Sequence, residues 1–369
     1  MNAKNILFII PAMQQGGAER VLSLMANYWA EKACTVSIMV FNEKRSFYQL
    51  HPGVNFYLLN SAANSFGVFN FIINNFKRAK NYFKYIKQIN PDIIISFTDN
   101  ANVYAVLYNR FKKKPLIIAQ RTNPYYNTLP RFIRFLPRQI YKRAHAMVVQ
   151  TLQTIDIYQN LKIPLPKIVK VIYNPLNEAI YKPRPEVKRT NIILAVGRLY
   201  NRDKHFDKLI DIFHATGDHQ WQLHIAGEGP DRKILEDKIK LLQLSDKILL
   251  LGSISDLAPL YQTARIFVMT SEFEGFPNAL CEAMANGCAC ISYDCATGPA
   301  EVIKNNSNGI LIAPGKQAEF TRQLNDLMND DNRIEQFSKA ASNLREVLNE
   351  KKIMQQWEEL IDKIIPLKN

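Results

Sequence analysis

One local pattern occurs twice in this chain of 369 residues: an unbroken apolar run, then a glycine-containing loop, then a helical segment. The first copy is Ile6–Ile10, followed by Gly16 and Gly17 and by apolar residues at helical spacing. The second is Ile192–Val196, followed at once by Gly197. Strands without polar alternation are typical of parallel sheets covered on both faces. With a length that suggests two domains, this pattern predicts two doubly wound, Rossmann-like α/β domains.

Other apolar runs supply the remaining predicted strands. In the first half these are Val36–Phe41, Ile93–Ser96, Leu116–Ala119 and Met147–Val149; in the second they are 223–226, Lys247–Gly252, Ile266–Thr270, Cys290–Tyr293 and Gly309–Ile312. Five prolines between residues 164 and 185 indicate an interdomain linker. Helices are expected over 316–349, and Ile353–Ile364 looks like a final amphipathic helix.

Composition excludes several classes of protein. No stretch reaches the roughly 18 unbroken apolar residues of a transmembrane helix. The apolar run after the first five residues is too short for a signal peptide and is interpreted as the first buried strand. The cysteines, including Cys288, Cys290 and Cys295, lack metal-ligand spacing. We therefore expect buried, reduced thiols in a cytoplasmic protein.

The net charge of +14 comes almost entirely from residues 60–150, where fifteen Lys and Arg residues face only Asp92 and Asp99. Two predicted helices there, Phe69–Ile86 and Leu129–Ala144, each carry an apolar stripe and a basic stripe, and Pro137 is expected to kink or divide the second. Each basic stripe is either a solvated face or a docking face for an anionic membrane. No nucleic-acid-binding motif accompanies the charge, so a membrane is favoured over nucleic acid.

Two glutamates, Glu274 and Glu282, flank a predicted helix start near Pro277. A helix N-terminus at the carboxyl edge of a parallel sheet binds phosphates. Carboxylates repel phosphates, so the combination indicates a ligand that carries both a diphosphate and hydroxyls, such as a nucleotide sugar. Arg198 and Lys204, after the second domain's first strand, can neutralise a diphosphate. The alternative is that these are charged surface residues.

The run Glu-Gly-Phe-Pro-Asn-Ala-Leu-Cys-Glu at 274–282 resembles the E-x(7)-E motif of retaining glycosyltransferases of family 4. Motifs in the order expected of that family lie at 16–20, 174–175, 197–204, 227–229 and 274–282. The resemblance implies the B-type glycosyltransferase fold (GT-B), with two Rossmann-like domains facing each other across a cleft. The expected parts are an acceptor- and membrane-facing domain at 1–180, a nucleotide-sugar domain at 181–349 and a helix at 350–369 that packs back on the first domain.

The resemblance also implies residue roles. Glu274, Arg198 and Lys204 would be catalytic, and Glu282 would hold the ribose hydroxyls. Many relatives place a histidine where this chain has Arg121, so Arg121 is a candidate donor to sugar or phosphate. The other expected donor-binding residues are Gly16, Gly17, Glu228, Gly229, Gly275, Phe276, Pro277, Asn278 and Ala279.

In such a family the leaving phosphate accepts the acceptor's proton on the same face, and configuration is retained. No Asp-x-Asp motif occurs, so a metal-independent enzyme without a cofactor is expected. The resemblance favours bacterial enzymes that move a hexose or N-acetylhexosamine, preferably from a UDP-sugar, to lipid-linked oligosaccharide, O-antigen or capsule precursors at the inner face of the membrane. Two alternatives remain open: a UDP-sugar epimerase of the same fold, and a nonenzymatic binder of anionic lipid or nucleic acid.

Overall fold

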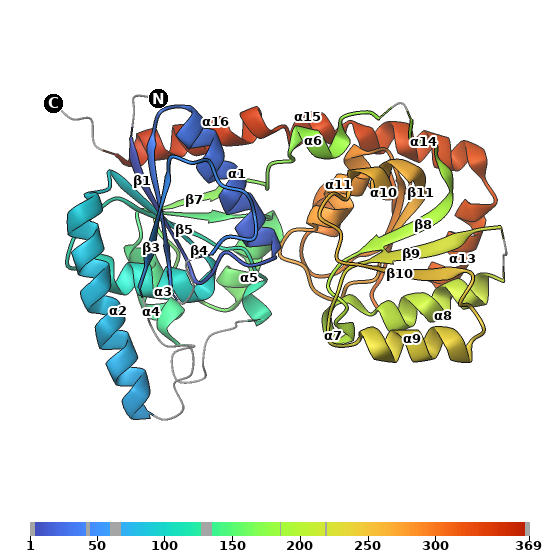
Figure 1. Cartoon of the computed structure of the whole chain (residues 1–369), viewed down its shortest axis with the longest axis horizontal. Helices are drawn as coiled ribbons and strands as arrows, with labels where there is room; N and C mark the ends of the chain where they lie inside the picture. Colours follow the sequence, from blue (N-terminus) through green and yellow to red (C-terminus); the bar gives the residue numbers. More distant parts are fainter. Residues whose placement is uncertain are drawn as a thin grey trace. The chain divides into compact units, whose positions relative to one another are not determined.

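The computed structural model describes residues 4–41, 45–59, 68–126, 135–184, 186–217 and 220–365. The chain forms two compact units, shown in Figure 1. One unit comprises Met1–Pro175 and Lys351–Asn369, and the other comprises Leu176–Glu350. The boundary thus follows Pro175, five residues before the predicted end of the first domain at residue 180. The proline-rich segment is therefore divided between the two units, with Pro164, Pro166 and Pro175 in the first.

The N-terminal unit contains a seven-stranded sheet in the order β3-β2-β1-β4-β5-β6-β7. All its strand pairs are parallel. The strands are β1 (Asn5–Ile10), β2 (Thr35–Val40), β3 (Val54–Leu58), β4 (Ile93–Phe97), β5 (Leu116–Ala119), β6 (Ala146–Val149) and β7 (Ile168–Val171). Its helices are α1 (Gly17–Glu31), α2 (Val68–Ile89), α3 (Thr98–Asn109), η1 (Pro124–Tyr126), α4 (Leu136–Ile140), η3 (Tyr141–Arg143) and α5 (Leu152–Asn160).

Alternate residues of the central strands enter two separate cores. Ile6 and Phe8 of β1 pack in the core that α1 covers, whereas Leu7 and Ile9 pack in the core beneath α2 and α3. Successive side chains of a strand point to opposite faces, so a strand buried on both faces must be apolar throughout. This geometry explains the unbroken apolar runs of the sequence.

The last helix, α16 (Glu350–Ile364), completes the core of the N-terminal unit. Its buried residues Ile353, Met354 and Trp357 belong to the same core as Phe8 of β1 and Trp29 of α1. Figure 1 shows α16 in red beside α1. Each fully buried side chain of this size stabilises the unit by about 2–3 kcal/mol, so the end of the chain is part of the first unit's structure.

The C-terminal unit contains a six-stranded parallel sheet in the order β10-β9-β8-β11-β12-β13. Its strands are β8 (Thr190–Val196), β9 (Gln222–Ala226), β10 (Ile248–Gly252), β11 (Ala264–Met269), β12 (Ala289–Tyr293) and β13 (Ile310–Ile312). Its helices are α6 (Glu178–Tyr181), α7 (Asn201–Lys204), α8 (Phe206–Thr216), α9 (Arg232–Leu241), α10 (Ala258–Thr263), α11 (Asn278–Ala285), α12 (Pro299–Val302), α13 (Gln317–Met328), α14 (Asp331–Ser342) and α15 (Leu344–Val347).

Every predicted strand is present, with ends shifted by up to two residues. The prediction missed β3 and β7, the two edge strands of the N-terminal sheet. Their residues are at most partly buried, and their apolar runs are broken by Asn55 and Lys170. The predicted helix Leu129–Ala144 lies partly outside the described residues, at 127–134. In the described part, α4 begins at Leu136, so Pro137 lies in the first turn of a helix. A division of the predicted helix at Pro137 stays a prediction, because the preceding residues lie outside the described part.

Candidate functional site

The strand order of the C-terminal unit has a switch point between β8 and β11, which are neighbours in the sheet. The chain leaves β8 toward β9 on one side, and it leaves β11 toward β12 on the other. The loops after the two strands therefore diverge and leave a crevice, the place where open α/β sheets bind ligands. These two loops contain Lys204 and Glu274.

Lys204 and Glu274 meet at this edge. The Lys204 ammonium donates to Glu274 Oε1 at 2.6 Å, and the exposed fractions of the two side chains are 23% and 12%. The aliphatic stem of Lys204 runs past Gly197, where a Cβ would lie 3.2 Å from Lys204 Cε. Thr270 at the end of β11 donates its hydroxyl to the Lys204 carbonyl at 2.9 Å. The sheet edge thus holds a cation and a carboxylate in one partly buried place.

Glycines allow two backbone segments to approach each other beside this pair. Gly227 has φ +149°, and a Cβ there would overlap the Gly197 carbonyl oxygen. A Cβ at Gly229 would overlap the Leu199 carbonyl oxygen in the same way. Leu199 N–H donates to the Glu228 carbonyl at 3.0 Å. Only glycine permits both the backbone conformation and the close approach, which explains the Gly-Glu-Gly sequence after β9.

Helix α11 begins at Asn278, as the proline predicted, and Pro277 is its N-cap. No side chain caps this helix start, although the Asn278 N–H donates to the Phe276 carbonyl at 2.9 Å. A helix N-terminus at this place suits an anion. Glu282 lies one turn further on and is only 1% exposed. Its Oε2 accepts from the Tyr261 hydroxyl at 3.0 Å. Tyr261 therefore orients Glu282, and sequence reasoning had not identified this partner.

Two predicted site residues, Arg198 and Glu228, have exposed side chains. Arg198 is exposed at the end of β8. Glu228 is 48% exposed and pairs through Oε1 with Arg232 at 2.7 Å. The side chain of Glu228 is thus turned toward α9, and the part of this residue that lies close to the β8 loop is its backbone.

The structure adds Thr297, which the sequence analysis did not select. Its hydroxyl donates to the Glu274 carbonyl and thereby holds the loop that carries the carboxylate. Gly298 follows with φ +105°, and a Cβ there would crowd the Pro277 ring. The only signal in the sequence was the turn-forming Thr-Gly-Pro after β12. Its proximity to Glu274 depends on β12 being the neighbour of β11.

In the N-terminal unit, the loop after β1 is held by a tyrosine. The Tyr48 hydroxyl donates to the Gly16 carbonyl at 2.9 Å and accepts from the Gly16 N–H at 3.3 Å. Gly16 is the N-cap of α1, and Gly17 is its first residue. A Cβ at Gly16 would overlap the Glu19 carboxylate. The absence of a side chain at Gly16 therefore leaves room for the Glu19 carboxylate at this helix start.

Arg121, at the carboxyl end of β5, is only 7% exposed. Its Nη1 donates to Asn174 Oδ1 at 2.6 Å, and its guanidinium lies 4.3 Å from the Phe97 ring centroid and 5.7 Å from that of Trp357. Within the described part of the chain, its Nε and Nη2 have no hydrogen-bond partner. Burial lowers the pKa of the guanidinium to about 9. A buried cation with two unused donors is a costly arrangement for a purely structural residue.

A second buried ionisable group lies at the same edge. Asp99, after β4, is 4% exposed and accepts from the Thr122 and Tyr141 hydroxyls, each at 3.2 Å. Burial raises the pKa of this carboxyl above its ordinary value of 3.8. The pKa of the adjacent Tyr141 hydroxyl is also raised by burial, so it remains a donor to the carboxylate.

Comparison with known proteins agrees with this geometry. Residues 15–179 match the model of Glycosyltransferase Family 4, and residues 177–344 match that of Glycosyl transferases group 1. A relative in Campylobacter jejuni is named GalNAc-alpha-(1->4)-GalNAc-alpha-(1->3)-diNAcBac-PP-undecaprenol alpha-1,4-N-acetyl-D-galactosaminyltransferase; it is 30% identical over 89% of each chain. This chain belongs to the family 4 glycosyltransferases.

Two further proteins are similar to this glycosyltransferase over nearly its whole length. The amylovoran biosynthesis glycosyltransferase AmsD of Erwinia amylovora is 27% identical over 97% of this chain and 99% of its own. A crystal structure of Anabaena HepE with UDP and glucose superposes with a TM-score of 0.80 at 19% identity, over 98% of this chain and 100% of that one. The predicted family, the enzyme class and the α/β fold of the B type are therefore confirmed.

The cysteines of the glycosyltransferase are all buried and free, as expected. Burial raises the pKa of the Cys288 thiol to about 11 and that of Cys295 to about 12, so neither is a reactive thiolate at neutral pH. Among the described residues, no group of three or more His, Cys, Asp or Glu side chains is placed to hold a metal ion. None of the described helices combines the length and apolarity needed to cross a bilayer.

Proposed function

We propose that this glycosyltransferase moves a hexose or N-acetylhexosamine, with retention of configuration, from a nucleotide sugar to a lipid-linked saccharide in bacterial surface-glycan synthesis. The observation that carries the proposal is the Lys204–Glu274 pair at the switch point, beside the uncapped start of α11. The names of the relatives support it, since one acts on a diphospho-undecaprenol-linked saccharide and another in amylovoran biosynthesis. The UDP in the Anabaena structure favours a UDP-sugar.

The Lys204–Glu274 pair suggests how binding of the donor's diphosphate also positions its sugar. A diphosphate at the start of α11 would draw Lys204 away from Glu274, because phosphate carries more negative charge than a carboxylate. Glu274 is then able to accept hydrogen bonds from the sugar hydroxyls. Arg198 is exposed and can swing onto the diphosphate, whereas Glu282 is held by Tyr261 in a position suited to the ribose diol. The backbone of Glu228 and Gly229 borders the base.

In the proposed reaction, bonds break and form in the two substrates, and the protein stabilises the charge that develops. The bond between the anomeric carbon and the diphosphate oxygen breaks, and the acceptor hydroxyl attacks the oxocarbenium-like carbon from the same face. The acceptor's proton passes to the leaving phosphate. Lys204, Arg198 and the helix start stabilise the charge that develops on the diphosphate, which is usually the largest single catalytic effect. Because these groups neutralise the leaving group, we propose that turnover persists in EDTA.

The acceptor side is assigned to the N-terminal unit. The loop with Gly16 and Gly17 belongs to this unit, and Arg121 offers two donors that no described residue uses. We propose that Arg121 donates to a hydroxyl or phosphate of a bound substrate, in the position where many relatives have a histidine.

Membrane docking is the proposed role of the basic face on α2. Four lysines on this helix are exposed, namely Lys77, Lys80, Lys84 and Lys87, and Phe76 is 73% exposed beside them. Arg78 is excluded from this set, since it stacks between Phe41 and Tyr104 at 4.7 and 4.3 Å. Lysines near an anionic membrane contribute about 1 kcal/mol each, and an exposed aromatic ring suits the interface.

The decisive experiment measures release of UDP or GDP from a panel of nucleotide sugars, with and without a bacterial lipid-linked saccharide extract. Wild type is compared with Glu274→Ala and, as a matched control, Glu272→Ala, because Glu272 is half exposed and pairs with His205. We expect acceptor-dependent release that Glu274→Ala abolishes and Glu272→Ala retains. Donor turnover without acceptor, with an epimerised product, would instead support the epimerase.

A further inference from the structure

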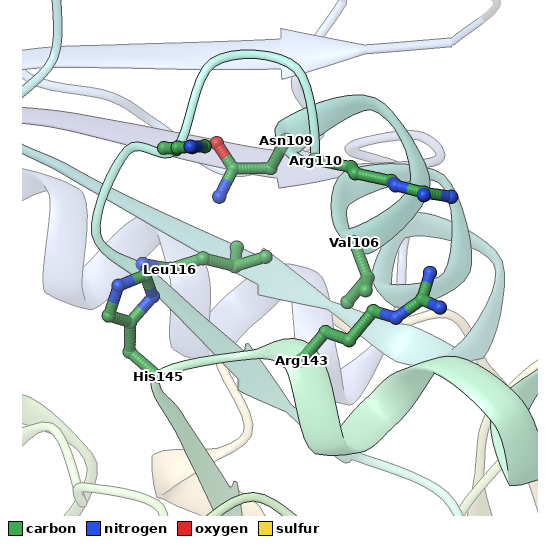
Figure 2. A pocket seen from close by; sticks show the side chains of 7 residues that line it. Val106, Asn109, Arg110, Leu116, Arg143 and His145 are labelled. Atoms are coloured by element: carbon green, nitrogen blue, oxygen red, sulfur yellow. Dashed lines mark hydrogen bonds between the residues drawn. The ribbon is translucent and has the colours of Figure 1, made fainter.

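A separate pocket of about 300 Å³ lies in the N-terminal unit, at the edge of the sheet where β5 and β6 begin. This is the edge opposite the one that carries Arg121 and Asp99. Figure 2 shows its walls: α3 and the turn after it on one side, and the segment from η3 to β6 on the other. The residues that line it are Val106, Asn109, Arg110, Lys113, Leu116, Arg143 and His145.

The pocket is rich in positive charge and has no negative charge. Of its seven lining residues, Arg110, Lys113 and Arg143 are cations, and none is acidic. None of the three cationic side chains forms an ion pair or hydrogen bond within the described part of the chain. They come from two separate segments, the end of α3 and the end of η3. Three unneutralised cations around one cavity favour an anionic ligand.

His145 adds a directed donor. Its Nδ1 accepts from the Leu116 N–H at 3.2 Å, so the neutral ring carries its proton on Nε2. Burial lowers the pKa of this imidazole below its ordinary 6.5, which keeps the ring neutral at pH 7. Figure 2 shows the imidazole beside Leu116, whereas Arg143 lies beside Val106 with its guanidinium directed away from His145, on the side where Arg110 lies. The pocket thus has two guanidinium groups on one side and an imidazole N–H on the other.

The inner wall is apolar and rigid. Val106 and Leu116 are 3% and 1% exposed. Asn109 is buried too, and its amide is already used, because it donates to the Lys114 carbonyl at 2.7 Å and accepts from the Lys114 N–H at 3.1 Å. An apolar floor with donors at its rim suits a small group that has an anionic head and a few carbon atoms.

The negative end of helix α3 explains only some of the basic residues that line this pocket. Basic residues after a helix stabilise its negative end, which accounts for Arg110 and Lys113 after α3. It does not account for Arg143 or His145, which belong to a different segment and line the same cavity. In addition, the Asn109 carbonyl at the end of α3 already accepts from the N–H groups of Lys112 and Lys113.

The surroundings indicate where such an anion would come from. Phe111 lies between Arg110 and Lys112 in sequence, is 73% exposed and packs edge-on against Phe83 of α2 at 5.8 Å. An exposed aromatic ring among basic residues is the combination found at membrane interfaces. Phe83 also connects this pocket to the helix whose lysines form the proposed docking face.

We propose that this pocket binds a phosphate group, such as the glycerophosphate headgroup of an anionic phospholipid, with Arg110 and Arg143 as its donors and His145 on the opposite wall. The site is distinct from the donor and acceptor sites, and it does not depend on the transferase mechanism proposed above.

The test uses the full-length protein, the variant Arg110→Gln/Arg143→Gln and a control that removes equal charge elsewhere in the unit. Lys352→Gln/Lys363→Gln is that control, since both lysines are exposed on α16, which packs in the core on the other face of the sheet from Val106 and Leu116. One arm titrates inorganic phosphate and glycerol 1-phosphate and follows the His145 ring signal by NMR. The other arm measures sedimentation with vesicles of phosphatidylcholine with or without phosphatidylglycerol. UDP release to a soluble acceptor analogue is assayed in parallel and should not change in either variant.

We expect the pocket variant to bind phosphatidylglycerol vesicles about tenfold or more weakly, while the control retains binding. The His145 signal should shift with glycerol 1-phosphate in wild type. A shift without pocket-dependent vesicle binding would assign the site to a soluble phosphate compound. Equal behaviour of the two variants, with an unmoved His145 signal, would overturn the proposal, even if the transferase activity is confirmed.

Discussion

Lys204 Nζ lies 2.6 Å from Glu274 Oε1, although 70 residues separate the two in sequence. The pair joins the loops that follow β8 and β11, the two strands at the switch point. Both side chains are largely shielded from water, so each neutralises the charge of the other. In the proposed function the pair links diphosphate binding to sugar binding, because Lys204 cannot turn to a phosphate without releasing Glu274.

Removing either member should impair catalysis more than folding. For Lys204→Ala and Glu274→Gln we expect kcat/KM to fall by about 10²–10³, the usual effect of losing one charge-stabilising group. The double variant should lose less than the product of the two effects, since the residues act as a unit. Steady-state kinetics of UDP release would show this, with Lys208→Ala as control, because Lys208 is an exposed residue of the adjacent helix α8. Independent, multiplicative losses would contradict the coupling.

The close approach at Gly227 predicts a stability effect. Gly227→Ala forces a Cβ onto the Gly197 carbonyl and strains a backbone with φ +149°. We expect a loss of about 3 kcal/mol in the free energy of unfolding. Gly217→Ala is the matched control, since Gly217 also has positive φ but no atom lies within 4 Å of its Cβ. It should cost about 1 kcal/mol. Urea unfolding would compare them, and equal losses would show that the close contact is unimportant.

Burial of Asp99 predicts a pH dependence. Its folded pKa is raised above 3.8, so the folded state binds more protons than the unfolded state between these two values. The free energy of unfolding should therefore fall as the pH rises through that window. Asp99→Asn removes the buried charge and should be more stable than wild type at pH 7 but not at pH 3. Urea unfolding at both pH values tests this, with exposed Asp156→Asn as control; the same difference at both pH values would refute it.

The variant Arg121→Met tests whether Arg121 contacts a substrate or only packs between its neighbours. Methionine keeps most of the volume between Phe97 and Trp357 but removes every donor. If Arg121 donates to a substrate, kcat/KM should fall by about tenfold to hundredfold, while the melting temperature is unchanged or higher because a buried cation has been lost. The contrary outcome is full activity with a lowered melting temperature, which would make Arg121 a structural residue that holds Asn174 and the rings together.

The fold was largely predictable because its determinants are local. Ile6–Ile10 and Ile192–Val196 are buried on both faces, so every residue in them is apolar and the pattern identifies them as strands of a parallel sheet. Pro277 predicted the start of α11 for an equally local reason. The edge strands β3 and β7 were not predicted. Partial burial weakens the apolar pattern of an edge strand.

The site was predictable only in part. Glu274, Glu282, Arg198 and Lys204 were selected from charge type and resemblance, but their partners were not. Tyr261 beside Glu282 and Thr297 beside the Glu274 carbonyl come from segments that the sheet brings together. The side chain of Glu228 is paired with Arg232 on the next helix, which its position beside two glycines did not reveal.

By itself, the sequence determined the two parallel-sheet units, the glycines at the ends of their first strands and the family to which the chain belongs, since periodicity, glycine placement and short motifs are properties of neighbouring residues. Only the tertiary structure decided that Lys204 pairs with Glu274, that Arg121 is buried between two aromatic rings, and that Arg110, Arg143 and His145 surround one pocket. Strand order and helix packing set those distances, and they result from the burial of apolar surface over the whole unit rather than from any short stretch of the chain.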